Sequence, residues 1–166
     1  MEYCEFKEIT NIRLIEIIRH QKINVSYIAK KSGISQSQIY KVFSGNSDTT
    51  LVTLYKILLS LNVDIELFFN FSIPSEKTIN YQKACAENNI LKIVKKNLKI
   101  QQANLSRLEG LTQSKIAEKM GYSDYKYINK LLSTKNNSVK DMYLSTLFSI
   151  TKQLGLEHKI HVIFRN

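Results

Sequence analysis

The chain has few residues that interrupt helices, with one proline and five glycines among its 166 residues. Proline and glycine are the strongest local breaks in regular structure, so their scarcity favours a mainly helical protein. Cysteine is also scarce. Cys4 and Cys85 lie far apart and match no metal-ligand spacing, which indicates reduced thiols and a cytoplasmic protein.

Long apolar runs are missing, and none approaches the roughly 20 residues of a membrane-spanning helix. Residues 1–10 have neither the basic start nor the apolar centre of a signal peptide. We therefore expect no membrane partner. No nucleophile stands beside a base, and His158 and His161 lack a third metal ligand. The sequence thus predicts no enzyme, no metal and no cofactor.

Positive charge is in excess, and it is unevenly distributed along the chain. The net charge is +10. Residues 1–73 hold 8 Lys and Arg against 7 Asp and Glu, whereas residues 74–166 hold 16 against 7. A basic balance of this kind favours a polyanionic partner, chiefly nucleic acid.

The chain repeats itself. INVSYIAKKSGISQSQIYKVFSG, from Ile23, aligns with LTQSKIAEKMGYSDYKYINKLLS, from Leu111, with one extra residue in the second copy. Further on, LLSLNVDIELFF aligns with ITKQLGLEHKIHVIF. Two copies of one unit predict an internal pseudo-dimer. We divide the chain into a first unit at 1–73, a connecting helical segment at 74–110 and a second unit at 111–166.

The first copy predicts four helices, at residues 10–22, 25–31, from Ser35 onward, and 51–61. Asn24 and Ser35 are good N-caps, and Gly33 suits the left-handed conformation at a helix end. The alternating segment DIELFFNF predicts a β-strand, as does its counterpart EHKIHVIFRN. Their opposite charges favour antiparallel pairing, within one chain or between two chains.

The expected fold class is therefore mainly α: two helix-turn-helix units in tandem, each ending in a β-strand, around a small central antiparallel sheet. Residues 88–109 of the connecting segment are amphipathic and predict one long helix that Gly110 ends. Its expected apolar side holds Leu91, Val94, Leu98, Leu105 and Leu108, and its expected lysine stripe holds Lys92, Lys95, Lys96 and Lys99.

Two short helices joined by a glycine turn form a helix-turn-helix, in which the start of the second helix meets the base edges in the DNA major groove. Gln36, Ser37 and Gln38 occupy that start. Glutamine pairs bidentately with adenine, and serine serves donors or acceptors alike. The dense polar stretch SQSQ therefore predicts a DNA-reading surface.

IAKKSGISQSQIYKVFSG resembles the Cro/cI-type, phage-repressor-like helix-turn-helix over residues 10–63. The motif's small, turn, core and loop-glycine positions hold Ala29, Gly33, Ile34, Ser35, Ile39 and Gly45. The resemblance implies base contacts from Gln36, Ser37 and Lys41, and we add Gln38 because it lies at the same helix start. It implies phosphate contacts from Asn24, Ser26, Tyr27, Ser44 and Asn46. The family often has glutamine as the first residue of its second helix, where this chain has Val25.

The second copy has Gln113 at that position, and IAEKMGYSDYKYINKLL resembles the longer turn of AraC-type motifs. The base contacts that we predict for it are Tyr125, Lys126, Asn129 and Lys130. The predicted phosphate contacts are Thr112, Gln113, Ser114, Ser133, Lys135 and Asn136.

The sequence thus predicts a sequence-specific double-stranded DNA-binding protein, a monomer with an internal pseudo-two-fold or a homodimer. Small proteins of this kind are usually transcriptional repressors, and the Lys-, Asn- and Ile-rich composition points to a bacterial mobile element, phage or plasmid. The architecture also resembles TraN-type DNA-binding proteins of Gram-positive conjugative plasmids, which implies an accessory role in conjugative transfer as one alternative. A protein-binding module, such as an antitoxin or host-factor inhibitor, is another.

Overall fold

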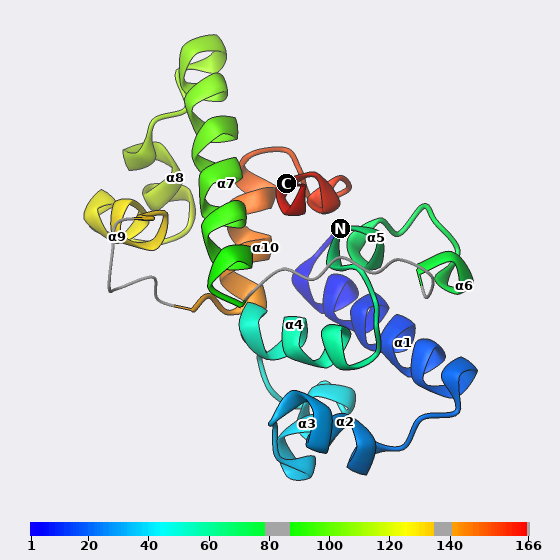
Figure 1. Cartoon of the computed structure of the whole chain (residues 1–166). Coiled ribbons are helices and arrows are strands. Elements are labelled where there is room, and N and C mark those ends of the chain that lie inside the picture. The colour runs from blue at the N-terminus through cyan, green and yellow to red at the C-terminus, as the bar shows by residue number, and fades with distance from the viewer. Residues whose placement is uncertain (79–86, 135–140, 166) are drawn as a thin grey trace.

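Helices make up the regular structure of the chain (Figure 1). The computed structural model describes residues 1–78, 87–134 and 141–165. The first part of the chain contains α1 (Tyr3–Gln21), α2 (Val25–Ser32), α3 (Gln36–Phe43), α4 (Leu51–Ser60), α5 (Ile65–Phe69) and α6 (Ser75–Thr78). The second contains α7 (Glu87–Glu109), α8 (Gln113–Lys119), α9 (Tyr125–Leu131), α10 (Leu144–Gln153) and the 3₁₀ helix η1 (Ile160–Phe164).

The predicted central sheet is wrong, because neither segment that was expected to form a strand does so and the described residues contain none. DIELFFNF contains α5 and EHKIHVIFRN contains η1. The Asp64 carboxylate accepts from the backbone N–H groups of Glu66 (2.8 Å) and Leu67 (3.2 Å) and so caps α5. Burial at Ile65, Phe68 and Phe69 follows the i, i+3, i+4 spacing of a helix, which the alternating pattern had masked.

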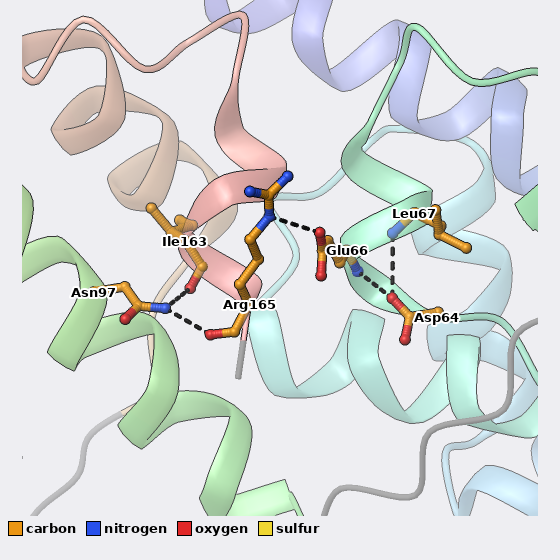
Figure 2. Close-up of polar contacts among 6 residues, drawn as sticks. All are labelled: Asp64, Glu66, Leu67, Asn97, Ile163 and Arg165. Carbon is orange, nitrogen blue, oxygen red and sulfur yellow. Dashed lines mark hydrogen bonds and ion pairs between the residues drawn. The ribbon is translucent and has the colours of Figure 1, made fainter.

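These two short helices nonetheless join the parts of the chain, as Figure 2 shows. Arg165 Nε donates to Glu66 Oε1 at 2.8 Å. Asn97 Nδ2, from α7, donates to the carbonyl oxygens of Ile163 (3.0 Å) and Arg165 (2.9 Å). The contact therefore forms within one chain, through side chains and helix ends instead of a β-ladder.

The long helices pack crosswise around one continuous apolar core. α1 packs against α10, and α7 packs against α4. Phenylalanines fill the place where the parts meet: Phe6 of α1 lies 4.9 Å from Phe148 of α10 and 5.8 Å from Phe69 of α5, between ring centroids. Phe69 in turn stacks on Phe164 of η1 at 4.9 Å. Because each long helix packs on an element from the other part, the two parts share a single core.

A second junction lies where the chain enters α4 and α10. Thr50 and Tyr143 form an isolated antiparallel bridge. The Leu51 N–H donates to the Met142 carbonyl (2.7 Å), and the Leu144 N–H donates to the Thr49 carbonyl (2.8 Å). These two hydrogen bonds are reciprocal, since the first N–H of each helix binds the carbonyl of the residue that precedes the other helix's N-cap.

The long helix predicted at 88–109 is confirmed as α7, but its faces differ in part from the prediction. Leu91, Val94 and Leu98 are buried as expected. Lys95, which was expected on the lysine stripe, is buried with them because it lies one turn from Leu91 and Leu98. Burial lowers the pKa of Lys95, and the nearby Asp141 carboxylate opposes that shift. Leu108 is 81% exposed, at the end of α7 that extends past the other helices (Figure 1).

Candidate nucleic-acid interface

The helix-turn-helix predicted in the first part is confirmed as α2 and α3. Asn24 Oδ1 accepts from the Tyr27 N–H at 2.8 Å and caps α2. Gly33 follows with a φ of +71°, a left-handed conformation that glycine adopts without a steric penalty. Ser35 Oγ then accepts from the Gln38 N–H at 3.3 Å and caps α3. The polar stretch SQSQ is thus a helix start.

The faces of α3 divide sharply between apolar and polar. Ile39 and Val42 are buried against the rest of the unit. The four predicted base contacts from this helix are all exposed: Gln36, Ser37, Gln38 and Lys41. The five predicted phosphate contacts are exposed as well: Asn24, Ser26, Tyr27, Ser44 and Asn46. A polar helix face that is free of the core is the geometry that a major-groove helix requires.

An open hollow of about 470 Å³ lies beside α3. Its lining includes Ser37, Gln38 and Lys41 from α3, Thr50 from the α4 start, and Tyr143 from the α10 start. Tyr143 is 54% exposed and comes from the other part of the chain. Sequence reasoning missed this residue. Extending the repeat alignment to the residue before α10 would have aligned Tyr143 with Thr50.

Where the sequence predicts a second helix-turn-helix, α8 and α9 are two short capped helices joined by a turn. Thr112 Oγ1 accepts from the Lys115 N–H at 3.3 Å, and Asp124 Oδ1 accepts from the Lys126 N–H at 2.8 Å. The two caps are one residue further apart than Asn24 and Ser35. The longer turn that the sequence predicted is therefore confirmed.

The exposed face of α9 holds all four predicted base contacts: Tyr125, Lys126, Asn129 and Lys130. Ile128 and Leu131 are buried on the other side. Tyr122 and Tyr127 pack together, with ring centroids 4.2 Å apart. The hydrogen bond with Tyr127, followed by burial, raises the pKa of Tyr122, and the two rings pack together beside the turn.

The predicted phosphate contacts of this second motif have different environments. Thr112 and Ser114 are exposed, while Gln113 and Ser133 are half-buried. Lys135 and Asn136 lie outside the described residues. In Figure 1, α3 and α9 occupy separate lobes, with α4 and α10 nearer the centre.

The described part of the chain lacks two other kinds of feature. No group of three or more His, Cys, Asp or Glu residues there is placed to hold a metal ion. None of the helices described is both long and apolar enough to cross a membrane.

Residues 14–68 match the model of a helix-turn-helix family. The match covers the second half of α1 from Leu14, all of α2 to α4 and most of α5. It supports a DNA-binding protein with a role in transcription regulation. Comparisons with curated proteins and with solved structures found no match, so the resemblance to TraN-type proteins has no support from them.

Proposed function

We propose that the chain binds double-stranded DNA sequence-specifically, with α3 in the major groove and the start of that helix at the base edges. The observation that carries this proposal is the split of α3 into a buried apolar side and an exposed polar side, within the segment that matches the helix-turn-helix family. Gln36, Ser37, Gln38 and Lys41 are the proposed base contacts. Asn24, Ser26, Tyr27, Ser44 and Asn46 are the proposed phosphate contacts.

The proposal extends to α9 as a second reading helix, in a second copy of the same unit. The order of elements supports it: a long helix, two short capped helices, a further helix and a short final helix occur as α1 to α5 and again as α7 to η1. Ile39 of α3 and Ile128 of α9, which the repeat aligns, are both fully buried. The crosswise packing of α1 on α10 and of α7 on α4 is what a pseudo-two-fold axis produces.

The charge of the chain fits a duplex partner. The excess of 16 Lys and Arg over 7 Asp and Glu in residues 74–166 includes Lys115 and Lys119 of α8 and Lys126 and Lys130 of α9, which are all exposed. Basic side chains bind phosphates and release counterions from the duplex. The second unit would thus supply much of the affinity, whatever the sequence that it contacts.

The two reading helices are chemically different, so the recognised site should be asymmetric. A homodimer presents two identical helices to a near-palindrome with half-sites about one helical turn apart, roughly 34–36 Å. Here α3 offers Gln36 and Ser37, whereas α9 offers Tyr125 and Lys126. One chain should therefore cover two unlike half-sites, over about two turns of DNA.

Selection of bound duplexes from a random pool tests the proposal directly. We expect enrichment of one bipartite, asymmetric site, with one chain per duplex by sedimentation. Failure to enrich any sequence would reject specific DNA binding and favour a protein-binding module. A palindrome bound by two chains would reject the internal pseudo-dimer.

We further propose that the chain acts as a repressor of a bacterial mobile element, phage or plasmid. This rests on the helix-turn-helix match and on the Lys-, Asn- and Ile-rich composition. A reporter whose promoter overlaps the selected site should lose expression when the chain is supplied. The Gln36→Ala variant should restore it, and a reporter that is unaffected or activated would reject repression.

A further inference from the structure

Two aspartates cap helices across the junction between the two units. Asp48 follows α3, and its carboxylate accepts from the Ser145 N–H at the start of α10 (3.3 Å) and from the Ser145 hydroxyl. Asp141 precedes α10, and its carboxylate accepts from the Val52 N–H at the start of α4 (3.2 Å). Each aspartate therefore satisfies a free N–H in the first turn of the other unit's helix.

The two contacts are equivalent by position. Asp48 lies two residues before Thr50, the N-cap of α4, and Asp141 lies two residues before Tyr143, the N-cap of α10. Each binds the second residue of the opposite helix. A reciprocal pattern in which i contacts j and j contacts i defines a two-fold interface, and the two hydrogen bonds beside Thr50 and Tyr143 follow the same rule.

Each aspartate also interacts with the long first helix of its own unit. Tyr3 of α1 donates its hydroxyl to Asp48 Oδ1 at 2.5 Å. The charge of Asp141 acts on Lys95 of α7. The repeat aligns Lys95 with Lys7 of α1, which lies one helical turn after Tyr3. Asp48 thus joins α1 to the start of α10 through hydrogen bonds, and Asp141 joins the residues before α10 to the start of α4 and acts on α7 by its charge.

We propose that Asp48 and Asp141 are positioning residues that fix the distance and angle between the reading helices α3 and α9, and hence the spacing of the two half-sites on DNA. This inference rests on the proposed function. The phenylalanine core joins α1, α5, α10 and η1, whereas the aspartates join the starts of α4 and α10, the helices that follow α3 and α9 along the chain. Both aspartates are exposed, so replacing them opens no cavity in that core.

The spacing of half-sites is a sensitive measure of this role. Inserting one base pair moves the second half-site by about 3.4 Å and rotates it by about 35°, since a turn of DNA contains 10–10.5 base pairs. A rigid junction cannot follow that rotation, whereas a loosened junction can. Loss of the aspartates should therefore widen the accepted spacing without changing the bases that each half-site prefers.

The experiment uses the full chain and a duplex library with both selected half-sites separated by variable spacers. The wild-type chain should strongly prefer one spacing. Asp48→Ala with Asp141→Ala should reduce the preference for that spacing over its one-base-pair neighbours by about tenfold. Gln21→Ala is the matched control, because Gln21 Nε2 donates to the Leu61 carbonyl within the first unit and its loss should leave the spacing preference unchanged.

A cross-linked form keeps the test independent of stability. Thr50 and Tyr143 face each other in a non-hydrogen-bonded antiparallel pair, where Cα atoms lie about 4.5 Å apart, within disulfide range. Thr50→Cys with Tyr143→Cys, in a chain with Cys4→Ser and Cys85→Ser, should restore the narrow spacing to the double-alanine variant when oxidised.

The outcomes separate the two proposals. An unchanged spacing preference in the double-alanine variant, with a lowered melting temperature, would show that the aspartates only stabilise helices and would overturn the inference while DNA binding stands. Absence of any bipartite site with the wild-type chain would overturn the proposed function and this inference with it. A widened preference that the oxidised cross-link narrows again, and that Gln21→Ala does not reproduce, would establish the positioning role.

Discussion

Replacing Gln36 with alanine tests one proposed reading contact separately from the rest of the proposed interface. Gln36 is the first residue of α3 and is exposed, while the cap of this helix comes from Ser35. Glutamine and alanine have similar helix propensities, so the melting temperature should hardly change. A good bidentate contact to a base contributes about 1–3 kcal/mol of discrimination. Affinity for the selected site should therefore fall about 5- to 150-fold, since 1.4 kcal/mol corresponds to a factor of ten.

Titration of labelled duplexes by fluorescence anisotropy measures this loss on the selected site, on each single-base variant of it and on a random duplex. The loss should appear on the selected site and vanish where one particular base pair has been changed. Asn46→Ala, at a proposed phosphate contact, is the matched comparison and should weaken binding to all duplexes alike. Equal losses on selected and random duplexes for Gln36→Ala would refute its role as a reading residue.

Three further predictions concern salt and pH. With about six to ten phosphates neutralised by the whole chain, affinity should fall roughly 10³–10⁵-fold between 50 and 200 mM salt, and a flat response would contradict duplex binding. Burial, with Arg165 nearby, lowers the pKa of His161 in η1, so the unfolded chain binds the proton more readily. The melting temperature of the wild-type chain should therefore fall as the pH drops below about 6.5, and less steeply in the His161→Gln variant. Melting temperatures that fall equally in the two proteins would exclude His161 as the cause. Burial and the hydrogen bond to Asp48 raise the pKa of Tyr3, so the contribution of Tyr3 to stability is present below about pH 10 and lost above it. Denaturant titrations from pH 9 to 11 should show a steeper loss of the unfolding free energy for wild type than for Tyr3→Phe. An equal loss in the two proteins would exclude Tyr3 as the cause.

Local signals in the sequence predicted much of the helix-turn-helix. Asn24, Gly33 and Ser35 act on backbone groups within three or four residues, so their roles as caps and turn can be read directly from the chain. The short final helices could not be predicted in this way. Five residues are too few to separate an alternating pattern from a helical one, and the capping bond of Asp64 was the signal that favours a helix.

The contacts between the units were beyond local reasoning for another reason. Asp48 and Ser145 lie 97 residues apart, and Val52 and Asp141 lie 89 apart, so no pattern within one segment points from one to the other. The burial of Lys95 depends likewise on which elements approach α7 from outside. The repeat held the missing information, because both aspartates stand three residues before a leucine that begins a helix.

The proposed two copies share some residues at their junction. Asp48 and Asp141 cap the opposite helices, and Leu51 and Leu144 donate the reciprocal backbone bonds, although the N-caps Thr50 and Tyr143 differ. On the exposed faces of α3 and α9 the residue types diverge, from glutamine and serine to tyrosine and lysine. A homodimer must change both of its reading helices at once, whereas a chain with two linked units can change one face and keep the other. A symmetric frame with independent reading faces is therefore suited to an operator whose two halves differ.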